Sequence, residues 1–131
     1  MSLAVNANVK KRDVESAVAY FERAYELRQD DFMRVLLACY RARAGRFQEA
    51  RSVLGDLPVS PANYYNLACT YALLGERELA LDFLRRDFAE MRTSPGQLER
   101  QKAWARGDPD LESLRGDVRF EALVAPAEQG R

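Results

Sequence analysis

The stretch that decides the fold is Asn63–Leu84, which reads NYYNLACTYALLGERELALDFL. Apolar residues recur at helical spacing on both sides of Gly75. Glycine commonly ends a helix because it adopts a left-handed backbone conformation without a Cβ clash. The stretch therefore predicts two amphipathic helices joined by a tight turn at Gly75.

The same pattern occurs thirty residues upstream, and repeats of about this size indicate an array of helix pairs. Leu37–Leu54 aligns with Leu67–Leu84, with seven identical positions. Small residues lie where two helices must approach closely, and large apolar residues fill the space beside them. The identical pairs are Leu37 and Leu67, Ala38 and Ala68, Cys39 and Cys69, Ala42 and Ala72, Gly45 and Gly75, Ala50 and Ala80, and Leu54 and Leu84.

These segments resemble tetratricopeptide repeats, whose unit carries an apolar–small pair, an aromatic, a glycine turn, an alanine and a large apolar residue. In the upstream copy Arg34 and Arg41 replace the expected aromatics. A partial third copy is indicated by Ala17, Phe21 and Ala24. The resemblance implies an all-α fold, a right-handed α–α superhelix of about seven helices. The matching residues downstream are Tyr64, Leu67, Ala68, Tyr71, Gly75, Ala80 and Leu84, and those upstream are Leu37, Ala38, Gly45, Phe47, Ala50 and Leu54.

The length of 131 residues predicts a single domain, 1–131. The end of the chain resembles the tail of many bacterial tetratricopeptide proteins, with an acidic-proline turn at Asp108–Leu111, then Leu114, Arg119-Phe120 and Leu123. We interpret this tail as a cap that covers the last helix pair. The expected parts are a partial N-terminal repeat (1–30), two repeats (31–60 and 61–91), a degenerate repeat with the C-terminal cap (92–125) and a tail (126–131).

Local signals predict where most helices begin and end. We expect a first helix to end near Lys10–Arg12 and Asp13 to be the N-cap of the next one. Asp30 or Asp31 caps a helix that runs to about Ala44, and its partner ends at Leu54. Helices follow near 61–74, after Ser60 and Pro61, and near 76–91. A short helix over Gln97–Ala105 is expected to use Leu98 and Trp104 as apolar anchors.

The composition excludes several functions. Twenty basic and twenty acidic residues give no net charge, which argues against nucleic-acid and membrane-surface binding. The absence of histidine removes histidine-based acid–base catalysis and most zinc and iron sites. We therefore predict no enzymatic activity, no cofactor and no metal. No apolar run is long enough for a signal peptide or a membrane span, and the two cysteines are interpreted as free thiols, so we expect a cytoplasmic protein.

An acidic cluster near the C-terminus resembles the opening of a calcium loop. Asp108, Asp110 and Glu112 alternate as such ligands do. Ser113 stands at the position of the central glycine and Arg119 at that of the closing acidic ligand. The pattern therefore does not indicate calcium binding.

A group of arginines between residues 34 and 51 allows two interpretations. Because Arg34 and Arg41 replace core aromatics, their side chains must reach solvent, an acidic neighbour or a ligand. The structural interpretation pairs the arginines with carboxylates such as Glu15, Glu22 or Glu49. The functional interpretation is a site for an acidic peptide, with phosphate or RNA contact as a further alternative.

The family resemblance implies a concave groove lined by the first helices of successive units. Asn66 lies where peptide-binding members of the family often place an asparagine that holds a ligand's backbone or terminal carboxylate. Packing of Phe32 and Tyr65 on neighbouring helices is the alternative for those two residues. The candidate groove residues, carried over position by position, are Phe32, Val35, Cys39, Arg43, Tyr65, Asn66, Cys69 and Leu73.

The sequence therefore predicts a non-enzymatic protein–protein interaction scaffold that binds a peptide or helix of a partner, acidic or amphipathic, in this groove. One alternative is a homodimer, since an unfinished N-terminal unit leaves an apolar end that another copy covers. A third hypothesis is RNA binding, because other helical repeats read RNA. The neutral charge and the lack of a repeated polar pair at groove positions argue against it.

Overall fold

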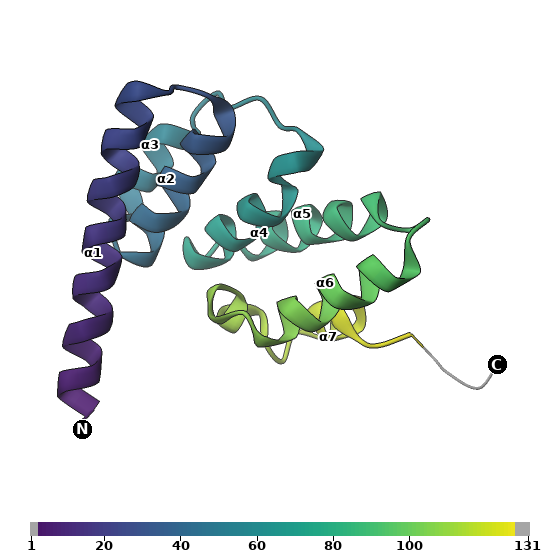
Figure 1. Ribbon diagram of the computed structural model, residues 1–131. Coiled ribbons are helices and arrows are strands. Elements are labelled where there is room, and N and C mark those ends of the chain that lie inside the picture. Colours follow the sequence, from purple (N-terminus) through teal and green to yellow (C-terminus); the bar gives the residue numbers. More distant parts are fainter. Residues whose placement is uncertain (1–2, 128–131) are drawn as a thin grey trace. The chain divides into compact units, whose positions relative to one another are not determined.

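The fold is entirely helical in the computed structural model, which describes the backbone of residues 3–127 and side chains from residue 13 onward. This confirms the predicted all-α class, while the hand of the superhelix stays a prediction. The described residues form seven α-helices and two 3-10 helices (η): α1 Leu3–Leu27, α2 Asp31–Arg43, α3 Phe47–Leu54, η1 Pro61–Asn63, α4 Tyr64–Leu73, α5 Arg77–Glu90, α6 Pro95–Gly107, η2 Pro109–Leu114 and α7 Val118–Val124 (Figure 1).

The chain divides into two compact units, Met1–Pro58 and Val59–Arg131. The first unit contains α1, α2 and α3, and the second contains the elements from η1 to α7. The division falls near the predicted boundary between the repeats 31–60 and 61–91. The finer repeat boundaries remain predictions.

Each unit contains one helix pair that turns at a glycine. Gly45 has φ +79° and Gly75 has φ +81°, so both adopt the left-handed conformation that the sequence predicts. Each glycine N–H donates to an alanine carbonyl, to Ala42 at 3.0 Å and to Ala72 at 3.1 Å. The helix pairs α2–α3 and α4–α5 are therefore two copies of the same local structure.

The repeated small and large apolar residues form the cores of these pairs. In the first unit Leu37, Ala38, Ala50 and Leu54 are buried. Their counterparts Leu67, Ala68, Ala80 and Leu84 are buried in the second unit. Asp30 begins α2 as predicted, since its carboxylate accepts the Met33 N–H at 2.8 Å.

The N-terminal helix differs from the prediction. α1 runs without a break from Leu3 to Leu27, so the expected helix end near Lys10–Arg12 and the N-cap at Asp13 are wrong. Aligning Ala17 with Ala50 and Ala80 places Arg12 where the other copies have the turn glycines. A non-glycine residue pays roughly 1–2 kcal/mol for the left-handed conformation. The helix therefore continues through Arg12.

The C-terminal elements pack within the second unit through leucine and phenylalanine side chains. Leu111, Leu114 and Phe120 are buried and Leu123 is half-buried. α6 is longer than the predicted Gln97–Ala105, because Pro95 takes a first-turn position and the helix continues to Gly107. The predicted role of Trp104 as an apolar anchor is wrong, since its side chain is 67% exposed and Ala105 is the buried residue beside it.

Candidate functional site

The face of α4 that carries Tyr65 and Cys69 contacts the segment that follows α6. The Tyr65 hydroxyl donates a hydrogen bond to Asp108 Oδ2 at 2.8 Å. The Cys69 thiol approaches the same oxygen at 3.7 Å. Two of the predicted groove residues, Tyr65 and Cys69, therefore contact Asp108 of the same chain.

Asp108 connects α6 to η2. Its Oδ1 accepts the Asp110 N–H at 3.0 Å, which caps η2. Farther along, the Ser113 hydroxyl donates to the Ala72 carbonyl of α4 at 3.1 Å. These bonds and the buried Leu111 and Leu114 fix η2 along α4.

The environment of Tyr65 keeps its hydroxyl protonated. Burial raises the pKa of Tyr65 well above its ordinary value, and the neighbouring Cys69 and the hydrogen bond to Asp108 raise it further. A protonated hydroxyl is the form that can donate to the carboxylate. Tyr65 therefore remains a hydrogen-bond donor at physiological pH.

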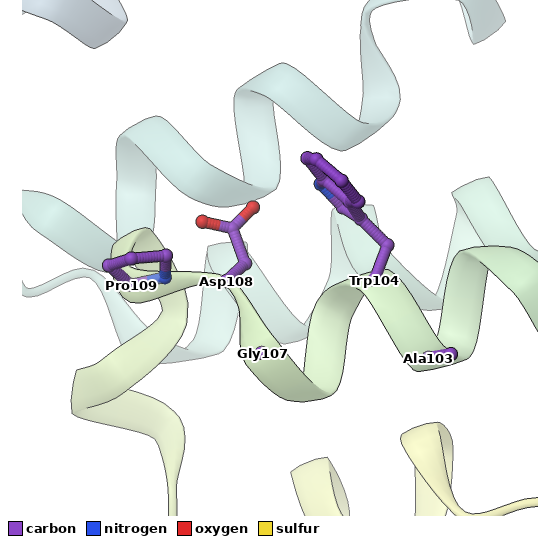
Figure 2. Close-up of a pocket in the computed structure, with 5 residues that line it drawn as sticks. All are labelled: Ala103, Trp104, Gly107, Asp108 and Pro109. Atoms are coloured by element: carbon purple, nitrogen blue, oxygen red, sulfur yellow. The ribbon is translucent and has the colours of Figure 1, made fainter.

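A pocket of about 320 Å³ lies beside this contact, lined by Ala103, Trp104, Gly107, Asp108 and Pro109. Figure 2 shows Trp104 and Asp108 projecting from the same side of the C-terminal part of α6. The spacing of four residues places them one turn apart on that side. The pocket combines an exposed indole with one carboxylate and otherwise apolar walls, which suits an apolar side chain of a ligand.

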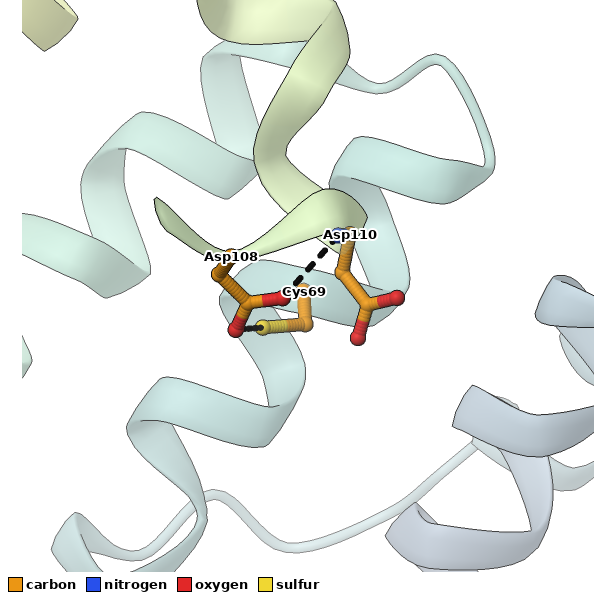
Figure 3. A group of neighbouring side chains, drawn as sticks. All are labelled: Cys69, Asp108 and Asp110. Atoms are coloured by element: carbon orange, nitrogen blue, oxygen red, sulfur yellow. Dashed lines mark hydrogen bonds between the residues drawn. The ribbon is translucent and has the colours of Figure 1, made fainter. Parts of the chain in front are cut away.

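Cys69, Asp108 and Asp110 form the one group among the described residues with metal-ligand spacing, since their ligand atoms lie within 4.8 Å of one another (Figure 3). A thiolate with two carboxylates is a donor set that zinc accepts. Here, however, the Asp108 carboxylate already caps η2 and accepts the Tyr65 hydroxyl. These contacts give the group a structural role in joining η2 to α4.

The remaining predicted groove residues differ in their exposure. Phe32 is 48% exposed, and the Arg43 guanidinium lies 4.4 Å from the centre of the Tyr40 ring. Val35 and Cys39 are buried. Asn66 and Leu73 are half-buried on α4. Phe32, Val35, Cys39 and Arg43 thus belong to the first unit, and Tyr65, Asn66, Cys69 and Leu73 belong to the second.

The arginines of the first unit pair within the chain, as the structural interpretation predicts. Arg41 binds Glu22 at 2.9 Å, and Arg46 pairs with Glu15. Arg34 pairs with Asp56 at 2.9 Å, a carboxylate that was not among the predicted partners. Its side chain also donates a hydrogen bond to the Val53 carbonyl at 2.6 Å. Arg34 thus replaces the aromatic of the family pattern with hydrogen bonds to the end of α3 and the turn after it.

Cys39 and Cys69 are buried thiols that are not joined in a disulfide, in agreement with the sequence interpretation. Asp108 and Ser113 were missed as partners of α4. In the sequence, both residues belong to a segment that resembles a calcium loop or a cap. Nothing in their spacing indicates a contact with α4, which lies about forty residues upstream. Trp104 is exposed because the neighbouring Ala105, not Trp104, is the buried residue of this part of α6. The irregular spacing of apolar residues after Met91 did not predict which of the two is buried.

A comparison with protein families supplies the decisive observation. The family model described as "Tetratricopeptide repeat" matches residues 3–31 and 61–86. The chain carries tetratricopeptide repeats in these two ranges. The matched ranges omit residues 32–60, where Arg34 and Arg41 replace aromatics, although α2 and α3 form the same glycine-turned pair.

Tetratricopeptide repeats are generally protein–protein interaction modules and non-enzymatic scaffolds. No match was found among curated proteins or among solved structures. None of the helices in residues 3–127 combines the length and the apolar character that a membrane span needs.

Proposed function

We propose that this tetratricopeptide repeat protein is a non-enzymatic scaffold that binds a peptide or helix of a partner protein, and that its second unit contacts the partner at the pocket beside Trp104. The observation that carries the proposal is the exposed indole of Trp104 at the edge of a preformed pocket. Tryptophan is enriched among the residues that contribute most to protein–protein binding.

The chemistry of the pocket favours an amphipathic segment as the partner. Ala103, Trp104, Gly107 and Pro109 offer apolar surface to one anchoring side chain. The case for an acidic partner depended on unpaired arginines, and Arg34, Arg41 and Arg46 have carboxylate partners within the chain. The proposal therefore rests on apolar contact, with hydrogen bonds at the margin supplying orientation.

The predicted groove residues enter the proposal in two roles. Phe32 and Arg43 in the first unit, and the half-buried Tyr65, Asn66 and Leu73 in the second, are proposed as partner contacts. The buried Val35, Cys39 and Cys69 support the helices that carry them. Tyr65 is connected to the pocket directly, because its hydroxyl binds the pocket residue Asp108.

Selection from a library of random displayed peptides tests this proposal. We expect the intact chain to enrich peptides that share an apolar anchor, and Trp104→Ala to weaken their binding by about tenfold or more. Because Trp104 is exposed, the variant should keep the helical circular dichroism spectrum of the parent.

Val118→Ala is the matched control, since Val118 is an exposed apolar residue of the same unit but lies on α7, outside the pocket. We expect its affinity for the selected peptides to equal that of the parent. Failure to enrich any peptide, or equal binding by Trp104→Ala, would contradict the proposal.

A further inference from the structure

The pocket beside Trp104 carries a negative charge on Asp108, which lines the pocket and is only half-buried. The donors that this carboxylate accepts, one backbone N–H, one hydroxyl and one thiol, carry no positive charge. Arg115 donates to the backbone carbonyl of Asp108 at 3.4 Å, and not to its carboxylate. Within residues 13–127 no lysine or arginine side chain forms an ion pair with the Asp108 carboxylate. Its charge is therefore open to a ligand.

The basic residues of α6 on either side of Trp104 make contacts elsewhere. Lys102 pairs with Glu99 at 3.4 Å, within the helix. Arg106 donates a hydrogen bond to the Val124 carbonyl of α7 at 2.5 Å. Both contacts direct positive charge away from the pocket, so the charge that the pocket presents is that of its carboxylate.

Trp104 adds an aromatic ring to the same pocket. It is 67% exposed and projects from the same side of α6 as Asp108, four residues and roughly 6 Å farther along the helix axis (Figure 2). The face of an indole ring is electron-rich and attracts cations more strongly than the other aromatic side chains do. The indole and the carboxylate together offer two attractive contacts to one cationic side chain.

Asp108 can accept a further donor without losing the contacts that fix η2. A carboxylate has about four acceptor sites on its two oxygens. The Asp110 N–H, the Tyr65 hydroxyl and the Cys69 thiol use three of them. One N–H of a ligand fills the fourth site, and η2 keeps its hydrogen bonds to α4.

We propose that the partner segment places an arginine between the Trp104 indole and the Asp108 carboxylate. This inference rests on the proposed function and adds a charge requirement to it. The apolar anchor of the partner contacts Ala103, Gly107 and Pro109, and the arginine lies beside that anchor. Arginine suits both surfaces, because its planar guanidinium stacks on aromatic rings and donates to carboxylates, and its aliphatic stem adds apolar contact.

Peptides selected on the intact chain from the random library are the probe. We expect arginine to be enriched beside the apolar anchor in these peptides. Replacing that arginine by citrulline, which has nearly the same shape and no charge, should weaken binding by about fivefold or more in calorimetry. Peptides that need Trp104 but show no enriched arginine, or that lose nothing with citrulline, would overturn this inference and leave the proposed function intact. Equal binding of both peptides to Trp104→Ala would contradict the proposed function itself.

Asp108→Asn tests the protein side of the contact, since asparagine removes the charge and is as good a helix cap as aspartate. We expect this variant to bind the arginine peptide about fivefold more weakly than the parent does. Its affinity for the citrulline peptide should stay within about twofold of the parent value. Equal weakening of both peptides would show that the substitution only disturbs the pocket, and the pairing would then be wrong. Two peptides on two proteins thus separate the charge contact from the structural contacts of Asp108.

Glu112→Gln is the matched control, because Glu112 is an exposed acidic residue of the same element, η2, outside the pocket lining. We expect the affinity of the arginine peptide for this variant to equal that for the parent. A loss as large as that of Asp108→Asn would assign the attraction to the general acidity of η2 and overturn the specific pairing.

The salt dependence of binding to the parent chain gives a test that does not depend on the folding of any variant. Raising the salt concentration from about 0.05 to 0.5 M screens the attraction between exposed charges. We expect the arginine peptide to lose about threefold in affinity relative to the citrulline peptide over this range. The same salt dependence for both peptides would contradict the proposed pairing.

Discussion

At the scale of single residues, Asp108 connects the candidate site to the fold. Its two oxygens accept three donors from different parts of the second unit: the Asp110 N–H, the Tyr65 hydroxyl and the Cys69 thiol. Hydrogen bonds to a charged acceptor are stronger than neutral ones, and leaving such an acceptor short of a donor costs free energy. The position of the pocket beside Trp104 therefore depends on these contacts.

Tyr65→Phe tests this dependence. The change removes one hydroxyl and keeps the ring, so we expect the free energy of unfolding to fall by about 1–2 kcal/mol. Tyr64→Phe is the control, because the Tyr64 ring lies 6.2 Å from that of Phe83 and that contact needs no hydroxyl. Urea unfolding followed by circular dichroism measures both. Equal stability of Tyr65→Phe and the parent would show that the hydrogen bond contributes nothing.

At the scale of elements, a cap and two ion pairs hold α7 to α5. Asp117 caps α7 by accepting the Arg119 N–H at 2.9 Å, and it also pairs with Arg77 of α5 at 3.6 Å. Arg119 in turn binds Glu78 of α5 at 2.8 Å. The hydrogen bonds from the Arg119 side chain and backbone lower the pKa of Asp117 to about 2.

A lowered pKa makes the contribution of Asp117 to stability depend on pH. In the unfolded chain an aspartate titrates near 3.9, so the contribution is complete above that value. It is lost as the pH falls from about 4 towards 2, where the folded state also takes up the proton. We expect the stability difference between the parent and Asp117→Asn to shrink over this interval, measured by urea unfolding at several pH values. A difference that stays constant from pH 6 to 2 would contradict the assignment.

Comparison of the elements shows what the sequence can predict. Gly45 and Gly75 mark their turns because the left-handed conformation strongly favours glycine, and both turns occur as predicted. The predicted end of the first helix is wrong because Arg12, unlike Gly45 and Gly75, disfavours the left-handed conformation of the turn. The partners of α4 were missed because Asp108 and Ser113 reach it through a tertiary contact that no local pattern encodes.

At the scale of the whole molecule, the sequence has equal numbers of acidic and basic residues, and several of them form ion pairs within each unit, such as Arg34–Asp56 and Arg119–Glu78. The surface that distinguishes this chain is instead the pocket in the second unit, which the exposed Trp104 borders. Tetratricopeptide repeats are generally protein-binding modules, and we propose a peptide or helix of a partner protein as the ligand of this pocket.

The most direct test of the central claim uses Trp104 as its own reporter, since it is the single tryptophan of the sequence. A peptide from the library selection is titrated into the chain while tryptophan emission and calorimetric heat are both recorded. The account predicts a blue shift of emission that saturates with the same dissociation constant as the heat, because the ligand covers the exposed indole. Binding seen by calorimetry with unchanged emission would place the partner elsewhere and contradict the proposed site.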